Sequence, residues 1–286
     1  MHPSPTLTPR DIALLRDTGR YRYLTSSQVA RLHFSHPKVA QRRLRQLVAA
    51  GLLRRFHPSE VTRAGFQTWW YALTRPGARE VSAATGLPLT AVLPPTRQPR
   101  TLGFLAHHTQ TTDFRLWLHE ACTPTSGFSY AYLPSYDETT SNGRRTRRAA
   151  LPLAGTPGSL VPDGVFTLTH GDRSALFVLE VDRGTEPLTG HHPNAIERKL
   201  LAYRTAYDTH AEDHLATLFG VDLSGFRILC LVPDAARQAR FLELARRLDL
   251  LPLVWVTTTS LTRDRGRLDT AAWAVTSTTD LHALSE

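Results

Sequence analysis

The sequence contains few cysteines and no long apolar run. Two cysteines, Cys122 and Cys230, lie far apart in 286 residues and form no C-x-x-C pair. They therefore suggest neither a disulfide framework nor a zinc site, and we expect reduced packing residues in a cytoplasmic protein. No apolar run approaches the roughly 20 residues that span a bilayer, and the N-terminal residues do not resemble a signal peptide. No membrane partner is expected.

Motifs for several enzyme classes are also missing. No glycine-rich phosphate loop and no G-x-S-x-G occur, which argues against a nucleotide hydrolase or an esterase. Two histidine pairs, His107-His108 and His191-His192, are adjacent in sequence. Adjacent side chains diverge on a helix, so neither pair predicts a metal chelate.

Acidic residues are scarce relative to basic ones. The chain has 34 Lys and Arg against 25 Asp and Glu, a net charge of +9 and a pI near 10.1. Such a charge favours a polyanionic partner, and nucleic acid comes first. The length and the 41% hydrophobic content indicate a globular protein, most plausibly with two domains.

The first 86 residues predict three helices followed by a β-hairpin. Thr8 caps a helix that begins with Pro9 and is expected to end at Gly19. Thr25 and Gln28 form a capping box for a second, short helix. A third helix over 38–50 precedes predicted strands at 52–56 and 66–74, and a fourth helix should follow Thr74 and end at Gly86. This order is typical of a winged helix-turn-helix domain that binds duplex DNA.

The third helix has two distinct faces. Ala40, Leu44, Leu47 and Val48 have the spacing of a core-facing stripe. A separate stripe is polar and basic, and no acidic residue occurs from Ser35 to Ser59. Such a stripe suits contacts with phosphates and base edges, although a solvated face of a small packing domain is the alternative. The residues expected to contact DNA are Lys38, Gln41, Arg42, Arg45, Arg54, Arg55 and Arg63.

Residues 87–100 contain four prolines and predict a linker, so that 101–286 would form a second domain. We expect a helix at 101–122 and another at 194–209, with Leu200 and Leu201 facing inward. A third, at 234–248, should pack through its alanines, among them Ala235, Ala236 and Ala239. Strands are predicted at 128–133, 165–169, 175–181, 226–232 and 253–257, while 138–158, with Arg144–Arg148, is expected to be a mobile loop. This order predicts a mixed sheet of the α/β (α+β) class.

Carboxylates interrupt an otherwise apolar strand. Glu180 and Asp182 lie two residues apart at its end and should project from one face. Asp163 precedes the partner strand, and a turn at 170–173 would bring it alongside them. Converging carboxylates need a cation or a basic group between them, which is typical of a Mg²⁺ site or of a former one.

The Pro162-Asp163 pair and the segment Phe177–Glu186, followed by Lys199 and Tyr203, resemble the replication-relaxation family of plasmid replication and mobilisation. The resemblance covers most of the chain. It implies an N-terminal winged helix and a restriction-endonuclease-like α/β domain of the PD-(D/E)xK type. It also implies that Asp163 and Glu180 occupy metal-binding positions. The nuclease pattern also has a lysine two residues after Glu180, where this sequence has Asp182. Lys199 is then either a catalytic lysine that has moved to the following helix or an ordinary ion-pair partner of the acids.

Three functions follow from these patterns. The first is a DNA-binding protein of replication-relaxation type, in which the second domain adds backbone contacts or oligomerisation into a homodimer. The second is a Mg²⁺-dependent endonuclease or nickase that uses Asp163, Glu180, Asp182 and Lys199. The third is an interaction module for replication or relaxase proteins. An ion network that only holds the fold is the alternative role of the carboxylates.

Overall fold

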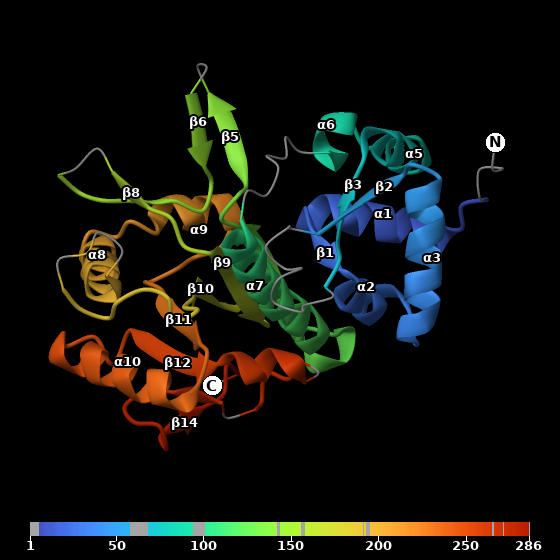
Figure 1. Cartoon of the computed structure of the whole chain (residues 1–286). Helices are drawn as coiled ribbons and strands as arrows, with labels where there is room; N and C mark the ends of the chain where they lie inside the picture. The colour runs from blue at the N-terminus through green and yellow to red at the C-terminus, as the bar shows by residue number, and fades with distance from the viewer. Residues whose placement is uncertain are drawn as a thin grey trace. The chain divides into compact units, whose positions relative to one another are not determined.

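The computed structural model describes residues 6–57, 68–93, 101–141, 144–155, 158–190, 192, 195–264, 266–270 and 272–285. The chain divides into two compact units, Met1–Leu116 and Trp117–Glu286, and the division falls within α7 (Leu102–Ala121) (Figure 1). The first unit thus extends beyond the predicted linker at 87–100. In the described ranges, no helix has both the length and the apolar character needed to cross a membrane.

The first unit begins with three helices whose starts follow the predicted caps. These are α1 (Pro9–Tyr21), α2 (Ser26–His33) and α3 (Pro37–Ala49). The Thr8 side chain caps α1 in a capping box with Asp11, and Thr25 does the same for α2 with Gln28. Each box satisfies backbone N–H groups that a helix start leaves without an intrahelical partner.

Gly19 does not end α1, contrary to the sequence prediction. The helix continues to Tyr21, and a Cβ atom at position 19 would lie 2.4 Å from the Val92 carbonyl oxygen. Val92 belongs to the short helix α6 (Leu89–Val92) and is buried. The glycine therefore permits a close approach of two backbones, and part of the predicted linker packs against the first unit's core.

A small antiparallel sheet completes this unit, in the order β1-β3-β2. Its strands are β1 (Leu24–Thr25), β2 (Leu53–Phe56) and β3 (Trp70–Leu73), and β1 was not predicted. Helix α5 (Arg75–Thr85) follows, capped by Thr74 and ended by Gly86 in the left-handed conformation, as predicted. The core that holds these elements together includes Leu14, Leu15, Leu24, Val29, Leu44, Leu47, Tyr71 and Val81.

The second unit is built on a seven-stranded mixed sheet in the order β14-β13-β12-β11-β10-β9-β4. The β10–β11 and β11–β12 pairs are parallel and the others antiparallel, which confirms the predicted mixed α/β class. The strands are β4 (Phe128–Pro134), β9 (Gly164–His170), β10 (Arg173–Val181), β11 (Arg227–Val232), β12 (Val254–Thr258), β13 (Trp273–Ala274) and β14 (Leu281–His282).

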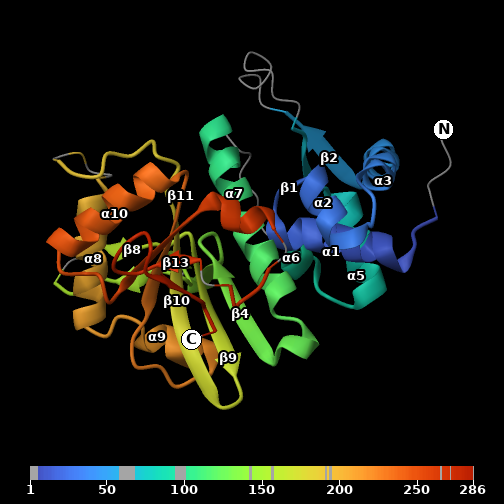
Figure 2. The same cartoon turned by 90° about the horizontal axis from the view of Figure 1, so that it is seen from below.

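Helices α8 (Ile196–Asp208) and α10 (Ala235–Arg247) share one core with β10, β11 and β12 (Figure 2). The inner face of α10 differs from the prediction, because Ala235, Ala236 and Ala239 are exposed. Arg237 and Gln238 are buried instead, since each has a polar partner in the second unit. Leu201, predicted to face inward from α8, is also exposed. The shorter α9 (Asp213–Phe219) follows α8.

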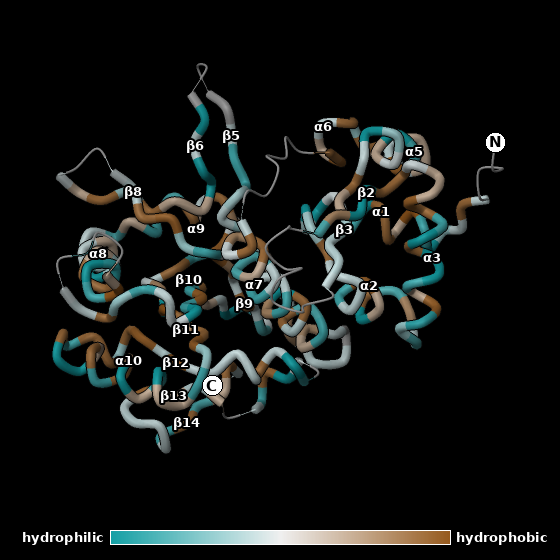
Figure 3. The backbone as a smooth tube through the Cα atoms, viewed as in Figure 1, coloured by the Kyte–Doolittle hydropathy of each residue, from teal (hydrophilic) through white to brown (hydrophobic). Residues whose placement is uncertain are grey.

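The segment predicted as a mobile loop at 138–158 forms strands instead. A two-stranded hairpin, β5 (Glu138–Ser141) and β6 (Arg144–Arg147), precedes the short pair β7 (Leu151–Pro152) and β8 (Ser159–Leu160). The hairpin is hydrophilic, whereas the central strand β11 is hydrophobic (Figure 3). Short 3-10 turns, η1 (Pro124–Ser126) and η2 (Thr259–Arg263), complete the unit.

Candidate functional site

The hairpin of β9 and β10 carries Asp163 to the end of β10. The strands pair antiparallel through the predicted turn, and this register places Asp163 directly before β9. Its backbone N–H donates to the Leu179 carbonyl at 3.0 Å, and its Oδ2 accepts from the Val181 N–H at 2.8 Å. Asp163 therefore lies beside the end of β10 that carries Glu180, as the sequence predicted.

Glu180 faces α8 and is buried at the end of β10. The ammonium of Lys199 and the hydroxyl of Tyr203 both donate to its carboxylate. These donors are four residues apart on α8, so they project from one face of that helix. Lys199 thus reaches the carboxylate as an ion-pair partner.

The buried charges change one another's titration. Burial raises the pKa of Glu180 to about 7; Lys199 opposes this shift, and Asp163 adds to it. Burial alone would lower the pKa of Lys199, but the attraction of Glu180 and Asp163 raises it, so the ammonium stays charged. Burial and the neighbouring carboxylates raise the pKa of Tyr203, which keeps its hydroxyl a donor. The cluster is a hydrogen-bonded ion network.

Asp182 contacts a different helix. The Arg237 Nε of α10 donates to Asp182 Oδ2 at 2.5 Å, and the Gly184 N–H donates to Oδ1 at 2.7 Å. Arg237 also donates to the Glu186 carbonyl at 2.7 Å. Both partners of the ion pair are buried, so each charge depends on the other for its solvation. Glu180 and Asp182 thus engage helices α8 and α10, which share one core with β10.

The carboxylates do not fit a Mg²⁺ ion in this arrangement. Magnesium requires several oxygen ligands in near-octahedral geometry. Here Lys199 binds Glu180, Arg237 binds Asp182, and a backbone N–H binds Asp163. Among the residues that the structure describes, no group of three or more His, Cys, Asp or Glu side chains is placed to hold a metal.

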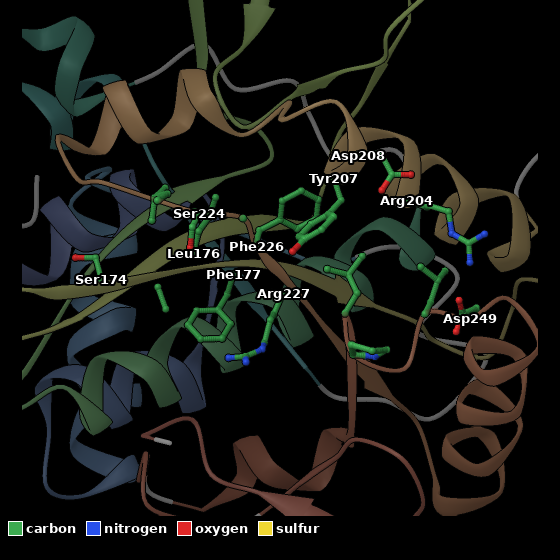
Figure 4. A pocket seen from close by; sticks show the side chains of 16 residues that line it. Ser174, Leu176, Phe177, Arg204, Tyr207, Asp208, Ser224, Phe226, Arg227 and Asp249 are labelled. Carbon is green, nitrogen blue, oxygen red and sulfur yellow. The ribbon is translucent and has the colours of Figure 1, made fainter.

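A pocket of about 670 Å³ opens at the other end of β10 (Figure 4). Its lining includes Ser174 and Phe177 of β10, Arg204 and Tyr207 of α8, and Arg227 of β11. None of the three carboxylates lines it. The carboxylate cluster therefore has no share in this cavity, and the two features are separate on the sheet.

Helix α3 presents the second set of predicted residues. Ala40, Leu44 and Leu47 are buried, as predicted for the inner face. The polar stripe of the same helix is exposed throughout. Its members are Lys38, Gln41, Arg42 and Arg45.

The basic residues of α3 differ in their partners. Arg43 donates from Nε and Nη2 to the two carboxylate oxygens of Asp11, at 2.7 Å each. Burial opposes ionisation of Asp11, but hydrogen bonds from Arg43 and Thr8 lower its pKa. No carboxylate in the described part of the first unit pairs with Lys38, Arg42 or Arg45. All three side chains are exposed.

Strand β2 adds two exposed arginines. The guanidinium of Arg54 lies 5.6 Å from the Phe56 ring centroid, and that of Arg55 lies 4.2 Å from the Trp69 ring centroid. Trp69 is 38% exposed, whereas Trp70 and Tyr71 are buried. Only Trp69 of this aromatic triplet is therefore available to a ligand. Arg63, the last residue expected to contact DNA, lies outside the described residues.

The structure thus defines a two-unit α/β protein with an exposed basic helix and a buried network of paired carboxylates. The family model described as replication-relaxation matches residues 15–221, and the chain belongs to this family. Neither the curated proteins nor the solved structures gave a match. Family membership supports a role related to replication or mobilisation.

One partner of the site was missed in the sequence. Arg237 was not singled out, because the predicted packing face of its helix was assigned to the alanines around it. The available signal was the inward position that it shares with Phe241 and Leu244, where a charge requires a buried partner. The hydroxyl of Tyr203, one of the residues that carry the family resemblance, also binds Glu180.

Proposed function

We propose that this protein binds duplex DNA through its first unit, as a winged helix-turn-helix domain, in plasmid replication or mobilisation. Helix α3 would act as the recognition helix. The sheet of β1, β2 and β3 would form the wing side of the domain, with Arg54 and Arg55 near the backbone. The order of three helices followed by an antiparallel sheet matches this docking mode.

The main support is the division of α3 between a buried apolar face and an exposed face of cations that form no ion pair with a described residue. An exposed helix usually mixes charges, because opposite charges one turn apart stabilise it slightly. Arg43 shows that α3 forms an ion pair where the fold needs one. The remaining cations have no such role within the described residues, and phosphate neutralisation accounts for them.

The test measures affinity for duplex DNA at several salt concentrations between about 50 and 200 mM. Arg42→Ala/Arg45→Ala should weaken binding and reduce the slope of log affinity against log salt by about 2, one for each lost phosphate contact. The matched control is Arg75→Ala/Arg79→Ala, which removes two exposed arginines from α5 in the same unit. If both variants weakened DNA binding equally, net charge alone would explain the binding. That result would contradict the role of α3 as recognition helix.

We propose a structural role for the carboxylate network, with metal-dependent DNA cleavage as the competing function. The position of Lys199 beside Glu180 and Asp163 favours cleavage, because a lysine near two acids can stabilise charge at a phosphodiester. Cleavage would require Lys199 and Arg237 to release carboxylates for Mg²⁺. The proposal predicts that supercoiled plasmid stays intact with Mg²⁺ or Mn²⁺. Nicking by the wild type that Asp163→Ala/Glu180→Ala abolishes would establish the competing function.

A further inference from the structure

The hairpin of β5 and β6 projects from the rest of the second unit (Figure 1). Neither of its strands contains an apolar residue. Its two strands read Glu-Thr-Thr-Ser and Arg-Arg-Thr-Arg, and they pair from Glu138 opposite Arg147 to Ser141 opposite Arg144. An isolated two-stranded hairpin is marginally stable in water, and an apolar face is the usual way to hold one. No residue in the described part of this hairpin belongs to the core, so its sequence requires a different explanation.

The base of the hairpin is firmly attached to the second unit. Arg148 donates to Asp137 at 3.0 Å, and its backbone N–H donates to the Asp137 carbonyl at 2.9 Å. Ala149 and Leu151 follow at once and are fully buried in the core beneath. The two strands are therefore anchored to the second unit where they begin and end, and they extend from there into solvent.

The charge on the hairpin is concentrated and largely uncompensated. Residues 138–148 contain four arginines and one acidic residue, Glu138. Arg148 is neutralised by Asp137. Arg145 and Arg147 are exposed, and no ion pair joins either of them to a described residue. Since alternate residues of a strand share a face, these two guanidiniums project from the same side of the hairpin.

We propose that this hairpin is a second DNA contact, in which Arg145 and Arg147 hold the phosphate backbone of the duplex. The inference rests on the proposed DNA binding by the first unit. The major groove of B-DNA admits a two-stranded β-ribbon of this kind. Guanidinium groups bind phosphate in a bidentate manner, so arginine suits this contact better than lysine.

The experiment compares the salt dependence of duplex affinity for three double variants and the wild type. Arg145→Ala/Arg147→Ala should lower the slope by about 2, as should the α3 variant Arg42→Ala/Arg45→Ala. The control, Arg240→Ala/Arg247→Ala, removes two exposed arginines of α10 in the same unit and should leave the slope close to that of the wild type. Glu138→Gln should strengthen binding, because it removes the one acidic group that faces the phosphates from this hairpin.

A footprint on the bound duplex supplies an independent readout. The hairpin variant should lose protection in one part of the wild-type footprint and retain the part that depends on α3. An unchanged slope and footprint for the hairpin variant, with a weakened α3 variant, would overturn this inference and leave DNA binding by α3 intact. An acidic protein would then be the better partner for the hairpin. Absence of wild-type binding would overturn both proposals.

Discussion

The guanidinium of Arg237 on α10 binds the carboxylate of Asp182, with its Nε 2.5 Å from Oδ2. Arg237 comes from a helix more than fifty residues further along the chain than Asp182. This buried ion pair joins α10 to the end of β10.

Arg237→Met should destabilise the second unit by about 3 kcal/mol, because it leaves the buried carboxylate of Asp182 uncompensated. Urea unfolding measures this change. The double variant Asp182→Leu/Arg237→Met should lose less stability than Arg237→Met alone, since no isolated charge remains. A double variant less stable than both single variants would contradict the account. At temperatures where the variants stay folded, their affinity for DNA should match that of the wild type.

Neighbouring arginines of α3 should have separate effects. Arg43→Ala should cost stability, because it removes both hydrogen bonds to the buried carboxylate of Asp11. Arg42→Ala should leave stability within about 0.5 kcal/mol and weaken duplex binding. Thermal unfolding and anisotropy titrations on the same samples separate the two results. If Arg42→Ala lowered stability as much as Arg43→Ala, the exposed face of α3 would have a structural role.

The free energy of unfolding below pH 6.5 should depend on His108. Its Nε2 donates to the carbonyls of Tyr21 at 2.9 Å and Tyr23 at 3.2 Å, all within the first unit. Burial lowers the pKa of His108 from 6.5 to about 4, so the folded state resists a proton that the unfolded state accepts. Stability should be full above pH 6.5 and should fall as the pH drops toward 4, by up to about 3 kcal/mol.

His108→Gln keeps a donor near the two carbonyls and removes this titration. Its stability should therefore vary less with pH than that of the wild type between pH 6.5 and 4. Chemical denaturation at a series of pH values gives both profiles. Parallel profiles for the two proteins would show that His108 is not the group responsible.

Gly19→Ala tests the close approach of α1 and α6. Helix propensity alone would make alanine more favourable by about 1 kcal/mol. A Cβ atom 2.4 Å from the Val92 carbonyl oxygen requires the backbones to separate, so we expect a loss of about 1–3 kcal/mol instead. The sign of the change in unfolding free energy decides the point. A gain in stability would mean that α6 is not held against α1.

Local signals in the sequence predicted most of the elements, because caps, periodicity and turn residues act over a few positions. Thr8, Thr25 and Gly86 marked helix ends correctly. Gly19 did not, since the close approach to Val92 depends on a segment 73 residues away. The strands at 138–147 were missed because their polar residues have no apolar alternation to mark them.

The same limit applies to the carboxylates. The position of Glu180 at the end of β10, with Asp182 directly after it, was readable from the sequence. Their partners were not, because Lys199 and Arg237 reach them only through the packing of α8 and α10. A cluster of acids in a sequence does not by itself show which basic side chains lie beside it, because those contacts are long-range.

Direct contact between α3 and DNA is the central claim. A photo-crosslinking residue, p-benzoylphenylalanine, placed at Gln41 tests it, because Gln41 is exposed between the basic residues of α3. The same residue placed at Arg79 of α5 serves as the control. The account predicts a covalent adduct with duplex DNA from position 41 and little or none from position 79. Equal adducts from both positions, or none from position 41 under conditions where the protein binds DNA, would contradict it.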